Sequence, residues 1–322
     1  MPANRLSLTL WLLGAALVTA FLAVACSPSA PAQPTGSPTP APDELTGPPG
    51  GPEYSAILVT SDLAVGTNRV SFGLVDRDGM PVRTPQAQVQ AVYLPPGQDQ
   101  GQVHQTATAQ FIQWPPPGER GVYVTSLDFD VPGEGTQAQP GLWALQITTT
   151  TSAGKHVQAQ TTMTVREEPA TPPIGSPAPP SVTPTAGEVD DLSAITTDHP
   201  PDPDLYQLSI DQALKAGKPL VVVFASPAFC VSATCGPQVK IVSQLKDRYK
   251  GQANFIHVEV FKDPQLIKGG RPGEDGVVPA VKEWGLPTEP WTFVMDRQGK
   301  VHAKFEQFTT EEEIEQALRE VL

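Results

Sequence analysis

Two segments rich in Pro, Ser, Thr and Ala divide the chain, and they limit what it can fold into more than any other feature. The first runs from residue 26 to 52 and the second from residue 168 to 203. This composition is typical of extended, poorly ordered linkers. The linkers leave residues 53–167 and 204–322, two stretches of about 115 to 120 residues that are each long enough for a core of their own. The sequence therefore predicts two domains.

Residues 1–25 have the pattern of an export segment, with Arg5 followed by an apolar stretch. The segment ends in Leu22-Ala23-Val24-Ala25 just before Cys26, which resembles the lipobox of bacterial lipoproteins. The resemblance implies a signal peptide that is cleaved after Ala25 and a lipid on Cys26. The alternative is an uncleaved transmembrane anchor, because a bilayer needs roughly 20 apolar residues. Both readings place the remaining chain on the extracytoplasmic face of the cell membrane.

The net charge limits the kinds of partner that we expect, and the cysteine content indicates the redox state of the chain. The chain carries 21 Lys and Arg against 34 Asp and Glu, a net charge of -13 at pH 7, and we find no basic patch. We therefore expect no nucleic-acid partner. Of the three cysteines, Cys26 is assigned to the lipid, which leaves Cys230 and Cys235 as one pair. Outside the cytoplasm this pair is expected to be oxidised unless a reductant acts on it.

Residues 53–167 contain about seven short runs with strand character, separated by turns such as Asp78-Gly79 and Pro132-Gly133. Apolar and polar residues alternate in these runs, as at Trp143, Leu145 and Ile147. The spacing predicts an all-β sandwich. This half loosely resembles the immunoglobulin-like domains of extracytoplasmic bacterial proteins, with Gly141-Leu142-Trp143 entering a late strand.

We expect no metal site and no cofactor in this first domain. Its Met and His residues, Met80, Met163, His104 and His156, are scattered without the spacing of metal ligands. Met163 lies in an alternating run and is predicted to be a core residue.

Residues 204–322 alternate between helical and strand patterns. In order, we expect a helix over 209–216, a strand over 220–224, a helix over 236–250, a strand over 255–261, a short helix over 277–284, a hairpin of strands over 291–296 and 300–305, and a final helix over 310–322. This is a mixed α/β domain.

Cys230 and Cys235 lie between the first strand of this domain and the helix that follows it. The N-terminus of a helix favours a thiolate, which is the attacking species in thiol-disulfide exchange. A structural disulfide is the alternative. In the chain-entropy model, a disulfide that closes such a short ring stabilises the folded state by only about 2 kcal/mol, so a purely structural bond here would contribute little.

The element order and the cysteine-bearing turn resemble the thioredoxin fold, over residues 205–322. The stretch Glu289-Pro290-Trp291 precedes the hairpin, where that family has a cis-proline, and the Asp296-Arg297-Gln298-Gly299 turn is similar to the membrane-anchored, extracytoplasmic branch. The resemblance implies that Pro290 is cis and lies against the sulfurs, and that a substrate backbone pairs with the edge beside it. It also implies that the partners are protein thiols or disulfides.

This chain departs from the family pattern at the cysteines, which four residues separate instead of two. If Cys235-Gly236-Pro237 is matched to the family motif, Gln238 takes the place of the resolving cysteine, Cys230 is the partner, and Cys235 is the low-pKa thiol at the start of the helix. If Cys230 is matched to the first cysteine, Cys235 resolves it across a longer turn. The second arrangement is closer to Sco-type copper chaperones, in which three residues separate the two cysteines and a distal histidine is also needed.

His257 is the remaining candidate for proton transfer or metal ligation. By the resemblance it falls where thioredoxins carry a lysine facing a buried carboxylate, and the position of that carboxylate is Val223 here. Glu259 shares its face of the strand. A hydrogen-bonded residue at the edge of the core is the alternative for both.

We therefore expect a membrane-anchored thiol-disulfide oxidoreductase with Cys230, Cys235, Pro290 and His257 at its site and no cofactor or metal. Two other hypotheses stay open. One is a redox-inactive interaction module with a structural disulfide, and the other is a Sco-like copper delivery protein.

Overall fold

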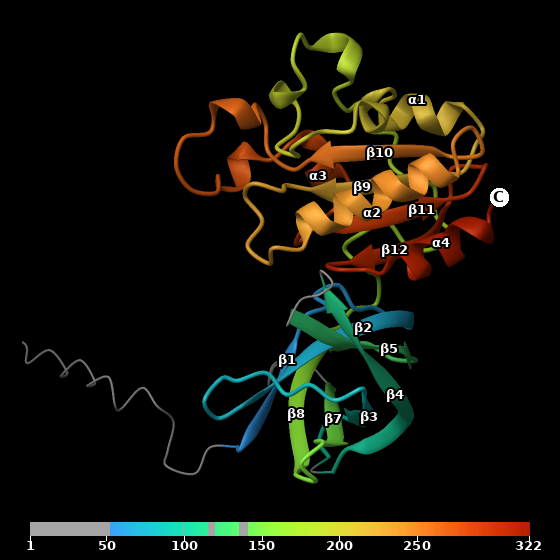
Figure 1. Ribbon diagram of the computed structural model, residues 1–322. Coiled ribbons are helices and arrows are strands. Elements are labelled where there is room, and N and C mark those ends of the chain that lie inside the picture. The colour runs from blue at the N-terminus through green and yellow to red at the C-terminus, as the bar shows by residue number, and fades with distance from the viewer. Residues whose placement is uncertain (1–51, 99, 115–119, 135–140) are drawn as a thin grey trace, which may run out of the picture. The chain divides into compact units, whose positions relative to one another are not determined.

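The computed structural model describes residues 52–98, 100–114, 120–134 and 141–322 (Figure 1). The expected signal peptide, Cys26 and nearly all of the first linker lie outside these residues. Within the described ranges, no helix is long and apolar enough to cross a membrane.

In its described residues the first domain consists of strands joined by turns and loops, as expected. They are β1 (Tyr54–Leu58), β2 (Gly66–Asp76), β3 (Gln86–Leu94), β4 (Gln102–Trp114), β5 (Arg120–Phe129), β6 (Gly133–Glu134), β7 (Leu142–Thr150) and β8 (His156–Val165). All their pairings are antiparallel, in the order β1-β2-β5-β4-β3-β7-β8-β6.

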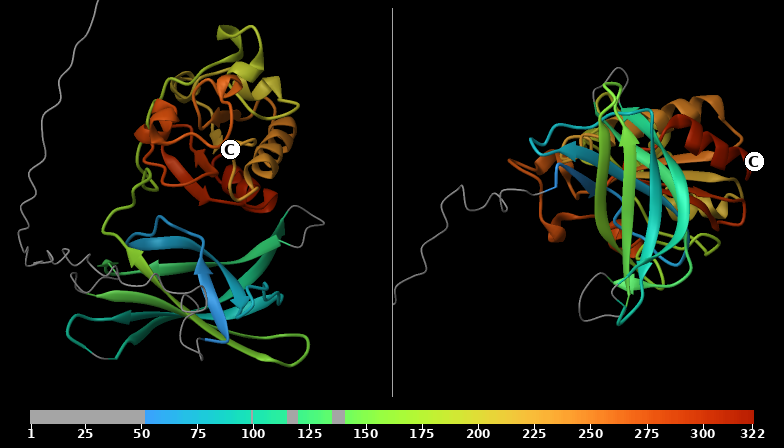
Figure 2. Two further views of the ribbon diagram at one scale, coloured as in Figure 1. Left: turned by 90° about the vertical axis from the view of Figure 1, so that its left-hand side faces the viewer. Right: turned by 90° about the horizontal axis from the view of Figure 1, so that it is seen from below.

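The hydrogen bonding of this domain differs from that of two separate sheets. One order links all eight described strands, and the sheet is strongly curved (Figure 2). A bulge at His104 of β4, opposite Ala91 and Val92 of β3, contributes, because the extra residue increases the local twist. Strands β1 and β8 approach each other although they lie toward opposite ends of the order.

The alternation in the sequence correctly identifies the core of this domain. Tyr123, Trp143, Leu145 and Ile147 are fully buried, and Met163 is buried with them. The indole nitrogen of Trp143 donates to the carbonyl of Val131 at 3.0 Å, so the largest core side chain is also satisfied in its polar group.

The second domain is a four-stranded sheet covered by helices on both faces. The α-helices and strands are α1 (Ile210–Lys215), β9 (Leu220–Ala225), α2 (Cys235–Arg248), β10 (Asn254–Glu259), α3 (Pro279–Glu283), β11 (Trp291–Met295), β12 (Val301–Glu306) and α4 (Glu311–Arg319). Short 3₁₀ turns are η2 (Ala186–Glu188), η3 (Leu192–Ala194), η4 (Pro203–Tyr206), η5 (Pro264–Leu266) and η6 (Glu274–Gly276). The expected order of elements is confirmed.

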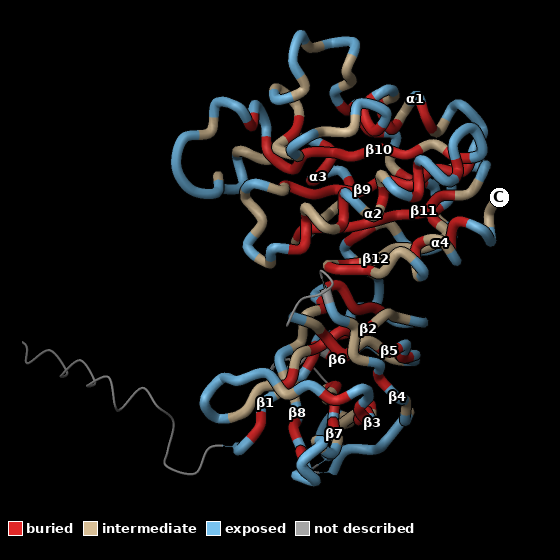
Figure 3. The backbone as a smooth tube through the Cα atoms, viewed as in Figure 1, coloured by how far each residue is buried: buried red, intermediate tan, exposed pale blue. Residues whose placement is uncertain are grey.

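The sheet order is β10-β9-β11-β12, with β10 parallel to β9 and β11 antiparallel to both of its neighbours. Strand β9 is buried on both faces, which explains its continuous apolar sequence (Figure 3). One face packs against α1 and α3, and the other against α2 and α4. The turn between β9 and α2 carries both cysteines.

The second proline-rich segment is not the poorly ordered linker expected from its composition. It lies along the second domain: the amide of Ala178 donates to the carbonyl of Gly299, and Ser181, Thr183 and Thr196 are buried. Its composition rules out a long helix or strand, but its hydroxyl and backbone groups still bond to the domain. For example, Ser181 accepts a hydrogen bond at 3.1 Å from the indole of Trp284.

Candidate active site

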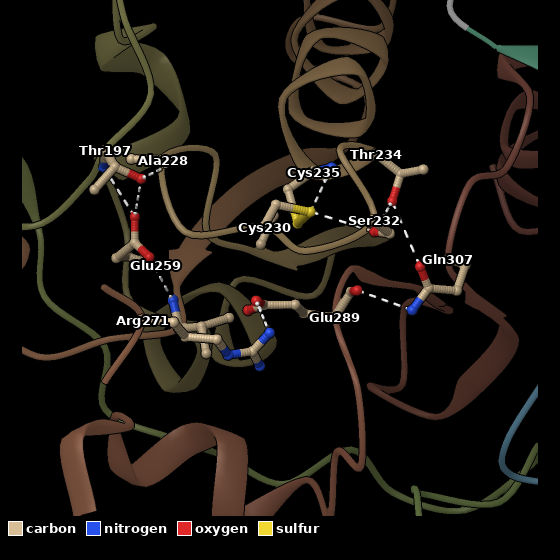
Figure 4. The surroundings of a disulfide bond; sticks show 12 residues. Thr197, Ala228, Cys230, Ser232, Thr234, Cys235, Glu259, Arg271, Glu289 and Gln307 are labelled. Atoms are coloured by element: carbon tan, nitrogen blue, oxygen red, sulfur yellow. Dashed lines mark hydrogen bonds and ion pairs between the residues drawn. A yellow bond between two sulfur atoms is a disulfide. The ribbon is translucent and has the colours of Figure 1, made fainter. Parts of the chain in front are cut away.

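Cys230 and Cys235 form a disulfide in the turn between β9 and α2 (Figure 4). Strand β9 ends at Ala225 and α2 begins at Cys235 itself, so the bond closes the turn onto the first residue of the helix. The two Cα atoms are 6.0 Å apart, within the usual range for a disulfide.

The two cysteines differ in exposure. Cys235 is completely buried among α2 and β9, whereas Cys230 is partly exposed. The next residue, Val231, is 82% exposed. A partner protein can therefore approach Cys230 but cannot approach Cys235 directly.

Polar groups surround the sulfur of Cys230. The backbone amide of Cys235 donates to it at 3.2 Å, and the hydroxyl of Ser232 lies 3.3 Å away. The Ser232 hydroxyl in turn lies 2.7 Å from that of Thr234. These donors and the N-terminus of α2 favour a negative charge on Cys230.

The two alignments of the cysteines differ in the roles that they give to Gln238 and Cys235. Gln238, the residue in the place of a resolving cysteine in the first alignment, is fully buried, and its side-chain oxygen accepts from the amide of Thr309 at 2.9 Å. It joins α2 to the start of α4. Helix α2 begins at Cys235, as in the first alignment, while the exposure of Cys230 and the burial of Cys235 agree with the second, in which Cys235 resolves Cys230.

The Glu289–Pro290 peptide bond is cis, as the resemblance implies, and Pro290 is buried. Gln307 connects this loop to the start of α2. Its amide nitrogen donates to the carbonyl of Glu289 at 2.9 Å, its backbone amide donates to the carbonyl of Pro290 at 2.8 Å, and its side-chain oxygen lies 3.5 Å from the hydroxyl of Thr234 (Figure 4).

His257 lies beside Val223 in the parallel register of β10 and β9, where the resemblance places it. It is 3% exposed and both ring nitrogens have partners: Nε2 is 3.0 Å from the carbonyl of Ala225, and Nδ1 is 2.7 Å from the hydroxyl of Tyr206. Burial lowers the pKa of His257, so the ring is neutral at pH 7. This arrangement supports the carbonyl at the end of β9 and does not present a proton to either sulfur.

Glu259 takes part in a second connection to the cysteine turn. One of its oxygens accepts from both the amide and the hydroxyl of Thr197, at 2.8 and 2.7 Å. The hydroxyl of Thr197 also accepts from the amide of Ala228, at 3.1 Å, two residues before Cys230. Thr197 was missed from the sequence because it lies in the segment expected to be a linker.

Glu289 is a second residue that the sequence did not single out. It is 6% exposed, and the guanidinium of Arg271 approaches one carboxylate oxygen at 3.1 Å. The geometry of this ion pair is not that of a hydrogen bond, so neither oxygen accepts one from the described residues. Burial raises the pKa of Glu289 to about 7, although Arg271 opposes the shift.

Nothing in the described part of the chain is arranged as a metal centre, since it holds no group of three or more His, Cys, Asp or Glu side chains suited to hold an ion. His104 and His156 of the first domain lie apart from the cysteines in sequence and belong to β4 and β8.

Two of three comparisons relate the chain to known proteins. Residues 206–322 match the model of a family described as thioredoxin-like domain. A comparison with curated proteins finds none that matches the chain. Among solved structures, the chain is similar to a putative thiol:disulfide interchange protein DsbE from Chlorobium tepidum, with 18% sequence identity and a TM-score of 0.30, over 47% of this chain and 99% of that chain.

Proposed function

Because residues 206–322 are a thioredoxin-like domain, we propose that the protein is a thiol-disulfide oxidoreductase that acts through Cys230 and Cys235. The observation that carries this proposal is the asymmetry of the pair. Cys230 is accessible and receives the amide of Cys235, while Cys235 is buried at the start of α2. A disulfide with a purely structural role needs no such difference in exposure and hydrogen bonding between its two sulfurs.

The exchange proceeds in two steps. With the pair reduced, the thiolate of Cys230 attacks a disulfide of the partner, forms a mixed disulfide and releases one partner thiolate. The thiolate of Cys235 then attacks the sulfur of Cys230, which closes the internal disulfide and releases the second partner thiolate. Two electrons pass from this protein to its partner, and the reverse sequence oxidises a partner dithiol.

The surrounding residues have distinct roles in this proposal. The amide of Cys235 and the hydroxyl of Ser232 stabilise Cys230 as a thiolate, both when it attacks and when it leaves. Pro290 shapes the loop before β11, and Gln307 holds that loop against the turn that carries the cysteines. His257 is a positioning residue for the end of β9 and not a proton donor.

The proposal also includes the cellular location of the protein. The export segment and the residues before Cys26 support a lipid anchor at Cys26, with both domains on the extracytoplasmic face of the cell membrane. Substrates would then be exported or membrane-bound proteins that carry thiols or disulfides.

The reduction potential of the Cys230–Cys235 pair tests the function. The chain with Cys26→Ser is equilibrated in glutathione buffers, quenched with acid, and its free thiols are counted after alkylation. We expect a potential above about -300 mV, as for catalytic and labile pairs. A lower value would identify the disulfide as structural and would support the interaction-module hypothesis.

A further inference from the structure

A pocket of about 650 Å³ lies beside the loop that contains Pro290. The segment from Val260 to Val277 and helix α3 form part of its walls, and residues 285–289 complete them. Apolar side chains line much of it, including Phe261, Val281 and Leu286. Of the charged residues in the lining, only Glu289 is buried.

The carboxylate of Glu289 has an unused oxygen in this pocket. Arg271 approaches Oε1 at 3.1 Å, while Oε2 accepts no hydrogen bond from any described residue. Arg271 itself is 42% exposed in its side chain and lies over the ring of Phe261, 5.5 Å from its centre. A buried carboxylate oxygen without a donor is costly, so a ligand that supplies a donor is favoured.

The pocket is joined to the redox turn at two points. Glu289 directly precedes Pro290, and its carbonyl accepts from Gln307, which also contacts Thr234 at the start of α2 (Figure 4). On the other side, the ring of Phe261 packs edge-on against Phe229, the residue before Cys230, with ring centres 5.7 Å apart. A partner whose sulfur reaches Cys230 therefore has neighbouring residues within reach of the pocket.

We propose that this pocket binds a lysine or arginine side chain of the partner protein, with the cationic nitrogen at the Glu289 carboxylate. The inference rests on the proposed function, because the partner is the protein that exchanges thiols with Cys230. The long aliphatic stem of such a side chain suits the apolar walls. Its charged N–H group supplies the donor that Oε2 lacks, and charge-assisted bonds of this kind are strong. The nearby carboxylate of Glu259 adds to the negative potential.

Cysteine peptides that differ at one position test this specificity. Lys, Arg, norleucine, Gln or Glu is placed in turn at each of three positions on either side of the cysteine. The measured quantity is the rate at which each peptide opens the Cys230–Cys235 disulfide of the full chain with Cys26→Ser. Each rate is divided by the rate of the same peptide with oxidised glutathione, which removes the effect of the basic residue on the peptide's own thiol.

At one of these positions we expect the Lys and Arg peptides to react about tenfold faster than the norleucine peptide, the effect of one charge-assisted bond. Glu289→Gln should abolish this preference, and the matched variant Glu274→Gln, at an exposed residue of the same lining, should keep it. Arg271→Gln should increase it, since this variant removes the resident cation while leaving Glu289 in place.

The peptide rates distinguish a failure of the proposed specificity for a cationic side chain from a failure of the proposed oxidoreductase function. Equal rates for all peptides with the wild-type chain, or a preference that survives Glu289→Gln, would overturn the specificity and leave the exchange activity intact. Equal rates for Gln and Lys peptides would also overturn it, because the site would then recognise a neutral donor. If no peptide opens the disulfide at all, the oxidoreductase function itself fails.

Discussion

Cys230 and Cys235 occupy different environments although only four residues separate them. The helix begins at Cys235, so that its sulfur turns into the core while its amide points to the sulfur of Cys230. In the loop between the two cysteines, the backbone of Ala233 adopts a left-handed conformation with φ of 59°. Such conformations in non-glycine residues concentrate at functional sites, where the surrounding structure enforces them.

Glu289 should make the stability of the protein depend on pH. Its pKa is raised by burial from 4.5 to about 7, so between these pH values the folded state keeps a proton that the unfolded state has lost. Stability should therefore fall as the pH rises from about 4.5 to 7. Glu289→Gln should remove this dependence and raise the free energy of unfolding at pH 8, by an amount on the order of 2 kcal/mol.

Urea unfolding at pH 5 and pH 8 measures this effect. Glu274→Gln serves as the control, because Glu274 is exposed in the same pocket. If wild type and Glu289→Gln lose or gain the same stability between the two pH values, the buried carboxyl does not titrate as described.

At the scale of elements, the segment that follows η3 connects the cysteine turn to β10 through Thr197. Thr197 bonds both to Glu259 on β10 and to the amide of Ala228 in the turn. Thr197→Val should lower the free energy of unfolding by about 1–3 kcal/mol, because it removes the hydrogen bond from the Thr197 hydroxyl to the buried carboxylate of Glu259 and the one that this hydroxyl accepts from Ala228. Thr197→Ser keeps the hydroxyl and should retain most of the stability. A valine variant as stable as the serine variant in urea unfolding would show that these bonds contribute nothing.

The elements of both domains could largely be predicted from the sequence, because their signals are local. Strand β9 follows from its apolar run, and α4 follows from Thr310, whose side chain accepts from the amide of Glu313 in a capping box. The cysteine pair and Pro290 could be predicted for the same reason and from the resemblance.

The partners of these residues could not be predicted, since they come from distant parts of the chain. Thr197 reaches Glu259 from a segment whose composition predicts disorder, and Gln307 reaches Glu289 across the turn after β12. Nothing local marks Glu289 as buried. Its setting depends on a loop that carries Arg271, and that loop has no periodic pattern.

At the scale of the whole molecule, the two proline-rich segments should differ in their effect on stability although their compositions are similar. Replacing residues 180–199 by a Gly/Ser sequence of equal length should lower the Tm by more than about 4 °C, because buried contacts such as Ser181 with Trp284 are lost. The same replacement of residues 27–48, expected from composition to be a linker, should change the Tm little. Calorimetry on the two variants makes the comparison, and equal shifts would contradict it.

The assignment of Cys230 as the attacking sulfur is the central claim, and trapping of the mixed disulfide tests it most directly. Reduced Cys235→Ser and Cys230→Ser variants, each also carrying Cys26→Ser, are mixed with oxidised glutathione, and the glutathione adduct is followed by mass spectrometry. The account predicts that Cys235→Ser forms a stable adduct on Cys230 at least about tenfold faster than Cys230→Ser forms one on the buried Cys235. Equal rates, or a faster reaction at Cys235, would contradict it.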